Sequence, residues 1–257
     1  MIVVKDLWKT FKLDRQHLKE MKRDGQNRAV HAVAGISFAC QPGRVFTLLG
    51  PNGAGKTTTL RMIATLLKPT SGSITVGGFD VSKEPQKVRA KIGFLTGTTK
   101  LYERLTAEEL VKYYADLHAM DSGLYRRRRD EIFSLLGINE FAGRRVGKLS
   151  SGMRQKVSVA RTIIHDPDVI VFDEPTVGLD VITAKHIIEL IRSCKQAGKT
   201  VIFSTHIMGE VSLLSDDLGI IHNGKLCYSG TYEDFRKGMQ RESLEEEFIR
   251  LVEGASQ

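Results

Sequence analysis

The residues from Gly50 to Thr58 read G-P-N-G-A-G-K-T-T, a pattern whose residue types suit phosphate chemistry. In G-x-x-x-x-G-K-[ST], glycines let backbone N–H groups surround phosphate oxygens, and the lysine reaches the β- and γ-phosphates. Lys56 takes the lysine's place, and the Thr57 hydroxyl is placed to bind Mg²⁺. An ordinary glycine-rich turn is the alternative. The predicted phosphate-binding residues are Gly50, Pro51, Asn52, Gly53, Ala54, Gly55, Lys56, Thr57 and Thr58.

A second pattern places two carboxylates, Asp173 and Glu174, at the end of the apolar run that begins at Val169. A carboxylate at the end of a buried strand is costly unless it meets a cation or hydrogen-bond donors. We therefore expect Asp173 to bind Mg²⁺ together with Thr57. Glu174, one residue beyond the strand, is expected to orient or deprotonate the attacking water. Taken alone, the run could equally be a strand end that turns to solvent.

Strand-like and helix-like segments alternate along the chain, which predicts a layered α/β fold that positions these residues. The expected strands are Ile2–Lys5, Val30–Phe38, Arg44–Leu49, Ser73–Val76, Lys91–Leu95, Val169–Phe172, Thr200–Ser204, Asp217–His222 and Lys225–Ser229. Asn223-Gly224 between the last two is a hairpin signal. The expected helices begin near Gly55, Ala107, Leu124, Ser151, Ile182 and Met208, with a last helix over Ser243–Val252. Residues 106–137 are expected to be helical with no strand.

The composition is typical of a globular protein, with 41% apolar and 26% charged residues among 257. No apolar run is long enough to cross a bilayer, and the N-terminal residues lack a signal-peptide core, so we expect a cytosolic protein. The three cysteines match no metal-binding pattern and are expected to be reduced packing residues. They are Cys40, Cys194 and Cys227.

The net charge of +8 allows either a nucleic-acid partner or contact with an anionic membrane surface. The basic residues cluster in Lys12–Arg28 and Arg126–Arg129, and neither cluster is interleaved with aromatic residues as a base-stacking surface would be. The charge alone decides little between these two kinds of partner. We expect the arginine run to be a solvated helix face.

Four further motifs carry a family resemblance. The segment Leu149–Lys156 reads L-S-S-G-M-R-Q-K and resembles the LSGGQ-x-[QR] signature of ATP-binding cassette (ABC) proteins. Gly178-Leu179-Asp180 is similar to the D-loop of that family, and Ser204-Thr205-His206 to its switch-histidine segment. Pro69–Ile74 is similar to the family's turn after the phosphate-loop helix. The resemblance covers Ile2 to about Phe235. The sequence around the phosphate loop is similar to that of exporter ATPases of the sodium-extrusion and multidrug type.

The resemblance implies the P-loop NTPase fold of ABC ATPases, a RecA-like core with an antiparallel β subdomain and a helical subdomain. It places a single ABC ATPase domain at residues 1–230, with the helical subdomain, about 98–160, inserted in the core. A short helical tail would occupy residues 231–257.

The resemblance also implies roles for individual residues. The signature residues Ser150, Ser151, Gly152 and Met153 would contact ATP held by the opposite subunit of a head-to-tail dimer. His206 would contact the γ-phosphate as a catalytic residue with Lys56 and Glu174, and Asp180 would link the two sites. The adenine of ATP would stack on Phe11, with Trp8 as the alternative. Either aromatic residue could instead simply pack in the core.

The sequence departs from the family pattern in three places. Gly97 stands where the family usually has a glutamine that meets Mg²⁺, so water or a neighbouring threonine must substitute. Ser151 and Met153 replace the usual glycine and glutamine of the signature. The basic insert within residues 12–28 is longer than the family norm and is either a solvated loop or a helix that touches a membrane or partner.

The resemblance thus implies an ATP-binding and ATP-hydrolysing subunit of an ABC transporter, peripheral on the cytoplasmic face of the membrane. It would power export, of sodium ions or a drug-like solute, through a separate polytopic membrane permease. A second nucleotide-binding subunit, another copy of this chain or a related one, would complete two ATP sites. The alternative is a soluble ABC-type ATPase that acts on nucleic acid or ribosomes, whose relatives usually carry two cassettes or a long coiled coil. A non-hydrolysing cassette is disfavoured because Lys56, Asp173, Glu174 and His206 are all present.

Overall fold

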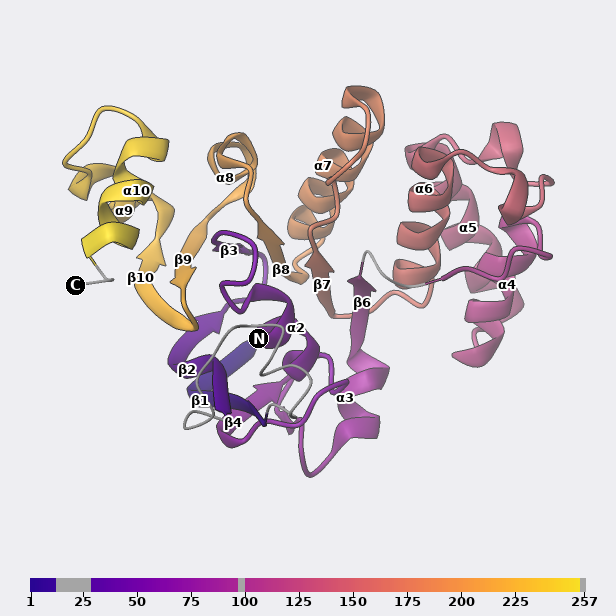
Figure 1. Cartoon of the computed structure of the whole chain (residues 1–257). Coiled ribbons are helices and arrows are strands. Elements are labelled where there is room, and N and C mark those ends of the chain that lie inside the picture. The colour runs from indigo at the N-terminus through magenta and orange to yellow at the C-terminus, as the bar shows by residue number, and fades with distance from the viewer. Residues whose placement is uncertain (13–28, 97–99, 255–257) are drawn as a thin grey trace.

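The computed structural model describes residues 1–12, 29–96 and 100–254, which form two sheets and the helices around them (Figure 1). Gly97 and nearly all of the basic insert lie outside the described residues, so the expectations about them stay predictions. The smaller sheet is antiparallel, with the strand order β2-β1-β4-β5. Its strands are β1 (Ile2–Lys12), β2 (Ala29–Cys40), β4 (Ser71–Val76) and β5 (Phe79–Asp80).

The larger sheet has six strands in the order β10-β9-β3-β8-β7-β6. They are β3 (Val45–Leu49), β6 (Ile92–Thr96), β7 (Val169–Asp173), β8 (Thr200–Thr205), β9 (Asp217–His222) and β10 (Lys225–Thr231). All neighbours are parallel except the β9–β10 hairpin. Every residue of β3, β7 and β8 is buried, as parallel strands covered on both faces require. Strand β8 lies between β3, which leads into the phosphate loop, and β7, which ends in Asp173.

The helices pack around the larger sheet. On one side of it, beyond β6, the helices α4, α5 and α6 form a helical extension (Figure 1). The helices are α2 (Lys56–Ile63), α3 (Pro85–Lys91), α4 (Ala107–Leu117), α5 (Ser122–Leu136), α6 (Ser151–Ile163), α7 (Val181–Gln196), α8 (Met208–Leu214), α9 (Tyr232–Gly238) and α10 (Leu244–Gly254). Over the described ranges, no helix combines the length and hydropathy that crossing a membrane requires.

Local capping explains where the helices of this extension begin and end. Thr106 and Glu109 form a capping box at the start of α4, each side chain bonded to the other's backbone N–H. Asp121 caps α5 by accepting hydrogen bonds from the N–H groups of Gly123 and Leu124. Gly137 ends α5 with a φ of 63°, in the left-handed region that favours glycine.

Three apolar clusters form the core. One joins the larger sheet to α4–α7, with Phe133 and Phe172 fully buried in it. Another joins the smaller sheet to α2 and the larger sheet. The last packs α8, α9 and α10 on β9 and β10, and contains the buried side chain of Phe235. The C-terminal helices are therefore packed on the core rather than projecting from it.

The predicted α/β fold is confirmed, and all nine expected strands are present. Strand β1 continues beyond Lys5 to Lys12 because Leu7 to Lys12 still pair with β2, and β2 gains Ala29, Ala39 and Cys40, which pair with β1. Helix α5 begins two residues before Leu124 because Asp121 caps it. Three elements of at most seven residues were not predicted: β5, α3 and α9.

The arginine run is only partly the solvated face that was expected. Arg126 and Arg127 are exposed, but Arg128 and Arg129 are half-buried and paired with acids. Arg129 also lies over the ring of Phe133, 4.4 Å from its centroid. The expectation was wrong for these two because a four-residue run covers more than one face of a helix. All three cysteines are free, as expected.

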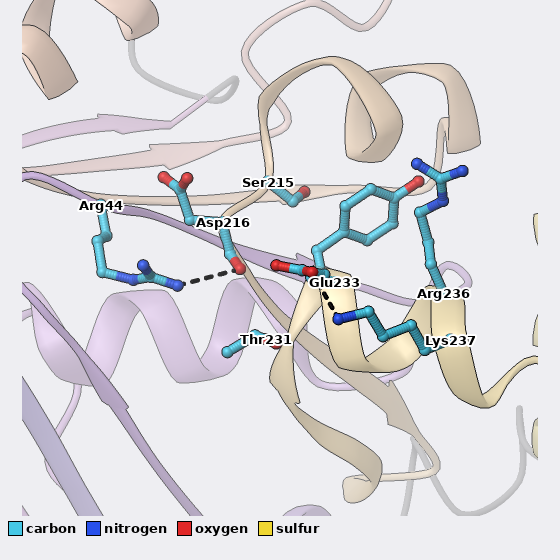
Figure 2. Close-up of a pocket in the computed structure, with 8 residues that line it drawn as sticks. Arg44, Ser215, Asp216, Thr231, Glu233, Arg236 and Lys237 are labelled. Carbon is cyan, nitrogen blue, oxygen red and sulfur yellow. Dashed lines mark hydrogen bonds and ion pairs between the residues drawn. The ribbon is translucent and has the colours of Figure 1, made fainter.

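A cavity of about 590 Å³ lies at the end of β3 away from the phosphate loop, where α9 meets the sheet (Figure 2). Its charged side chains are largely satisfied by one another or by neighbours. Lys237 Nζ lies 2.6 Å from Glu233 Oε1, and Arg44 Nη2 donates to the backbone oxygen of Asp216 at 3.2 Å. Asp216 also pairs with Lys195 at 2.7 Å. This cavity marks the attachment of the C-terminal helices, and its basic side chains (Arg44, Arg236 and Lys237) are nearly balanced by two acidic ones (Asp216 and Glu233).

Two histidines stack at the junction between the helical extension and the core. The rings of His118 and His165 are 3.7 Å apart and nearly parallel, in a groove that also contains Arg161 and Phe94. Burial and, to a smaller extent, the neighbouring His118 lower the pKa of His165 to about 4, although a hydrogen bond to the Ile92 carbonyl opposes the shift. His165 is therefore neutral in the folded protein at any pH above about 4.

We expect His165 to make the protein less stable in mild acid. Between pH 6.5 and about 4, the unfolded chain takes up a proton at His165 that the folded chain does not, so stability falls as pH falls through that range. Replacing His165 with glutamine should remove a pH dependence of roughly 2 kcal/mol, measured by urea unfolding at pH 7.5 and 4.5. The same replacement at the exposed His31 controls for loss of a histidine as such. An unchanged pH dependence in His165→Gln would contradict the assignment.

Candidate nucleotide-binding and hydrolysis site

The phosphate loop runs from the end of β3 to the start of α2, which is the strand–loop–helix order that the sequence predicted. Gly55 caps α2 with a φ of 109°, and a Cβ there would lie 2.4 Å from the carbonyl oxygen of Ala32. A Cβ at Gly50 would lie 2.3 Å from the carbonyl oxygen of Ile221. Only glycine fits at these two positions, because backbone from neighbouring strands packs against the loop. Because α2 begins directly after the loop, its first free N–H groups face the loop, as an anion site requires.

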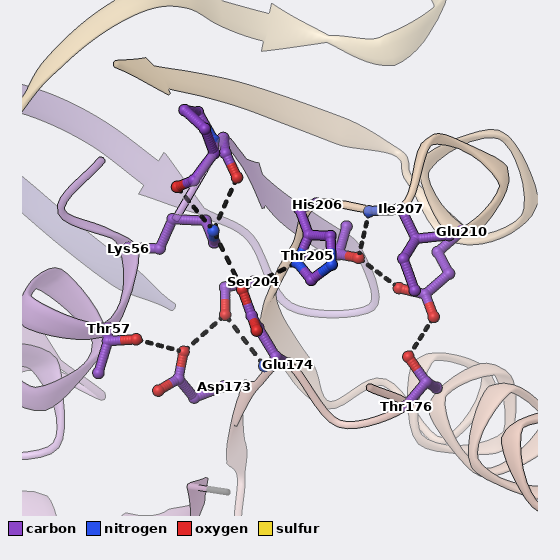
Figure 3. Close-up of polar contacts among 12 residues, drawn as sticks. Lys56, Thr57, Asp173, Glu174, Thr176, Ser204, Thr205, His206, Ile207 and Glu210 are labelled. Carbon is purple, nitrogen blue, oxygen red and sulfur yellow. Dashed lines mark hydrogen bonds and ion pairs between the residues drawn. The ribbon is translucent and has the colours of Figure 1, made fainter. Parts of the chain in front are cut away.

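Lys56 is a buried lysine whose ammonium group has three acceptors within reach (Figure 3). Nζ donates to the carbonyl oxygens of Gly50 at 2.7 Å and Pro51 at 3.1 Å, and lies 3.1 Å from Glu174 Oε1. Three acceptors use all three N–H donors of an ammonium group. A phosphate oxygen that binds Lys56 must therefore replace at least one of them.

Asp173 lies at the end of β7 and accepts two hydrogen bonds on the same oxygen (Figure 3). The Thr57 hydroxyl donates to Oδ1 at 3.0 Å, and the Ser204 hydroxyl donates to it at 2.7 Å. The structure thus brings Thr57 and Asp173 together from sequence positions 116 residues apart. Ser204 was not singled out as a site residue, although a serine at the buried end of an apolar strand is a usable signal.

Glu174 follows Asp173 with a φ of 49°, a left-handed conformation that is uncommon for residues other than glycine. Its N–H group donates to the Ser204 side chain at 3.1 Å and backbone at 3.2 Å, which fixes this turn. Its carboxylate lies 3.2 Å from His206 Nδ1 as well as beside Lys56. Burial raises the pKa of Glu174, but hydrogen bonds from Lys56 and His206 outweigh it and leave the pKa below its usual 4.5. Glu174 is therefore ionised at neutral pH, the state that a general base needs.

A cavity of about 370 Å³ opens beside these residues, lined by Thr57, Arg61, Thr96, Gln155, Asp173, Glu174 and Val177. The hydroxyl and carboxylate oxygens of Thr57 and Asp173 on its wall are ligands that Mg²⁺ prefers. No group of three or more His, Cys, Asp or Glu side chains in the described part of the chain is arranged to hold a metal. That agrees with Mg²⁺ binding through one or two carboxylates and the phosphates of the substrate. Arg61 and Gln155 were not predicted to line this site.

The signature residues occupy the start of α6, as predicted, and none of them lines the cavity beside Thr57 and Asp173. Ser150 caps α6 by accepting a hydrogen bond from the Met153 N–H at 3.2 Å, and Ser151 is exposed. A Cβ at Gly152 would lie 3.4 Å from Asp180 Oδ2. Within residues 1–12, 29–96 and 100–254, no hydrogen bond or ion pair joins these signature residues to residues 50–58. This separation is what the predicted contact with an opposite subunit requires.

Asp180 lies at the surface, where it caps α7 with both carboxylate oxygens. Oδ1 accepts from the Thr183 N–H at 2.9 Å, and Oδ2 accepts from the Thr183 hydroxyl at 2.8 Å. Three apolar side chains near it in the sequence are exposed: Val177 before it, and Val181 and Ile182 after it. An exposed apolar group at a helix start suits contact with another molecule.

Phe11, the predicted adenine contact, is 40% exposed on β1 and lies opposite Val30 on β2. Two residues along β2, the carbonyl of Ala32 packs against Gly55 of the phosphate loop. Phe11 is therefore exposed on the strand pair that touches the loop. Trp8 is bonded within its own strand, since Nε1 donates to Asp6 Oδ1 at 2.9 Å. The adenine contact stays a prediction for Phe11.

The fold and the site define a P-loop ATPase of the ABC class. The profile of the family described as "ABC transporter" matches residues 33–177, more than half of the chain, and the chain belongs to that family. It is similar to the ABC transporter ATP-binding protein NatA of Bacillus subtilis, with 44% identity over 90% of this chain and 95% of the relative. It is also 39% identical to the linearmycin resistance ATP-binding protein LnrL of the same organism, over 79% of this chain and 65% of that protein.

Solved structures agree with this assignment. The ATP-binding subunit of an ABC transporter matches with a TM-score of 0.84 and 28% identity, over 98% of this chain and 99% of the other. A dimeric ATP-binding cassette in a post-hydrolysis state with ADP and phosphate matches with a TM-score of 0.78 and 26% identity, over 90% and 98%. The chain is thus an ATP-binding, ATP-hydrolysing subunit of an ABC transporter, as predicted, and these comparisons give no support to the nucleic-acid alternative.

Proposed function

We propose that this subunit powers export through a separate polytopic permease, with sodium ions or a drug-like solute as the cargo. The observation that carries the proposal is the 44% identity to NatA over nearly the whole of both chains. The linearmycin resistance relative supports the drug-like cargo, and the bacitracin transport ATP-binding protein BcrA of Bacillus licheniformis, 36% identical over 79% of this chain, supports it too.

In the proposed mechanism, the phosphate loop binds the triphosphate and Lys56 exchanges one of its acceptors for a phosphate oxygen. Glu174 orients the attacking water and accepts its proton, and His206 holds the Glu174 carboxylate and contacts the γ-phosphate. Thr57 and Asp173 would hold Mg²⁺, which neutralises charge on the phosphates when bound. Because Glu174 is already ionised, water activation requires no prior loss of a proton from the protein.

Two copies, or this chain and a related one, would enclose two ATP molecules. Support comes from Ser150–Met153, which do not line the cavity beside the chain's own Thr57 and Asp173, and from the exposed apolar residues around Asp180. Dimer closure on ATP and opening after hydrolysis would move the permease. The subunit would then lie on the cytoplasmic face of the membrane, held there by the permease. Residues 1–230 would form the ATPase domain, with residues 98–160 as its helical subdomain and 231–257 as a tail.

The test is affinity purification of the tagged subunit from detergent-solubilised native membranes in the presence of ATP and Mg²⁺. We expect a polytopic membrane protein in stoichiometric amount. Ribosomes or DNA in its place would overturn the proposal in favour of the nucleic-acid alternative. For the cargo, inside-out vesicles supplied with ATP should accumulate sodium or a drug-like solute, and vesicles carrying Lys56→Ala should not. Accumulation of neither would refute the cargo classes.

A further inference from the structure

A buried carboxylate on α8, that of Glu210, joins two segments of the site and belongs to none of the motifs discussed above (Figure 3). The Thr205 hydroxyl donates to Oε2 at 2.5 Å, and the Thr176 hydroxyl donates to Oε1. Thr205 is fully buried, and Thr176 and Glu210 are each 6% exposed. A carboxylate at this depth is costly unless hydrogen bonds compensate it, so the bridge is stable only while both hydroxyls are in place.

The two hydroxyls belong to two different segments of the site, one next to Glu174 and one next to His206. Thr176 lies in the loop between Glu174 and Asp180, and Thr205 directly precedes His206 at the end of β8. Thr205 Oγ1 also accepts from the Ile207 N–H at 3.0 Å, so the turn that carries His206 is fixed from both sides. Glu210 therefore sets the distance between the loop of Glu174 and the turn of His206.

The same loop receives a hydrogen bond from the signature helix. Gln155 Nε2 on α6 donates to the carbonyl oxygen of Pro175 at 2.9 Å, next to Thr176. The loop that Glu210 anchors thus contacts α6 at one end and carries Asp180 at the other. A displacement of this loop reaches His206 through the carboxylate of Glu210, because that carboxylate is bonded to both segments.

We propose that Glu210 is a positioning residue that holds Glu174 and His206 in register and couples their geometry to the Asp180 loop. The coupling to the Asp180 loop rests on the proposed dimer. The positioning of Glu174 and His206 rests only on the hydrogen bonds within one chain. Glu210 touches no reacting group, and it acts through Thr176 and Thr205.

The experiment compares Glu210→Gln, Thr176→Val and Thr176→Ser by steady-state hydrolysis at saturating ATP and by ATP titration. We expect Glu210→Gln and Thr176→Val each to lower kcat about tenfold while the Kd for ATP changes less than about twofold. Thr176→Ser keeps the hydroxyl and should restore most of the rate. Glu233→Gln, an exposed glutamate on α9, is the matched control and should behave as the wild type. A parallel loss of ATP affinity, or equal losses in Thr176→Val and Thr176→Ser, would overturn the proposal.

A double mutant keeps the test decisive if one variant is less stable. Thr176→Val combined with Glu210→Gln should be no slower than either alone, since both break the same bridge, whereas independent effects would multiply to about a hundredfold and refute it. Size measurement with ATP and Mg²⁺ separates the two proposals. A chain that stays monomeric would refute the proposed dimer, while the effect of Glu210→Gln on kcat would still test the positioning role. A dimer with unchanged kcat in Glu210→Gln fails only the positioning role.

Discussion

Glu174→Gln is expected to lower ATP hydrolysis by about a hundredfold or more, the usual contribution of a positioned general base. Glutamine keeps the shape of Glu174 but cannot accept a proton from water. Binding of ATP should persist, because the phosphate loop, Thr57 and Asp173 are unchanged. We further expect ATP to bind at least as tightly as in the wild type. Lys56 Nζ lies 3.1 Å from Glu174 Oε1, and loss of that charge releases the lysine for phosphate.

The measurements are steady-state phosphate release, ATP titration and light scattering with and without ATP and Mg²⁺. The variant should accumulate as an ATP-bound dimer, because hydrolysis no longer separates the subunits. Glu189→Gln on α7, whose partner is Lys185, is the control for loss of a surface carboxylate. Wild-type turnover in Glu174→Gln would remove Glu174 from its proposed role.

Lys56→Ala is expected to fail at an earlier step, the binding of ATP. Each hydrogen bond from a charged donor to a phosphate oxygen contributes about 2 kcal/mol, so loss of even one such bond should weaken binding roughly thirtyfold. The variant also leaves Glu174 without its nearest cation, although His206 still contacts the carboxylate. Hydrolysis at saturating ATP should therefore be lost as well.

Isothermal titration with ATP and Mg²⁺ checks this prediction, with Lys87→Ala as the control because Lys87 is an exposed lysine on α3. Unaltered ATP affinity in Lys56→Ala would refute the phosphate-binding role of this residue. The thermal midpoint should be measured alongside, since Lys56 also bonds the carbonyl oxygens of Gly50 and Pro51.

The phosphate site could be predicted from the sequence because its residues lie in two short runs with strict spacing. Glycines at positions 50 and 55 mark close backbone approaches, and an apolar strand that ends in Asp173 marks a buried carboxylate. The pairing of Glu174 with both Lys56 and His206 could not be predicted, because it depends on the order of β3, β8 and β7 in the sheet. Strand order is set by long-range pairing that no local pattern encodes.

The role of Glu210 was missed for a related reason. A glutamate on an amphipathic helix usually faces solvent, and only the packing of α8 on β3 and β8 shows that this one is buried. The helices α3 and α9 did carry usable signals. Pro85 occupies the first turn of α3, and Thr231 caps α9 by accepting from the Asp234 N–H. Their short length hid them, because seven residues give too few turns for an apolar period to emerge.

The position of β8 has a consequence for the biosynthesis of the subunit. Strands β3 and β7 each pair with β8, which follows both of them in the chain. A nascent chain that has left the ribosome only as far as Asp173 holds both phosphate motifs but not the strand that sets their spacing. The contact between Thr57 and Asp173, 116 residues apart, then forms late, since pairings between distant residues are slow. A growing subunit therefore brings its two phosphate motifs together only after β8 has been synthesised.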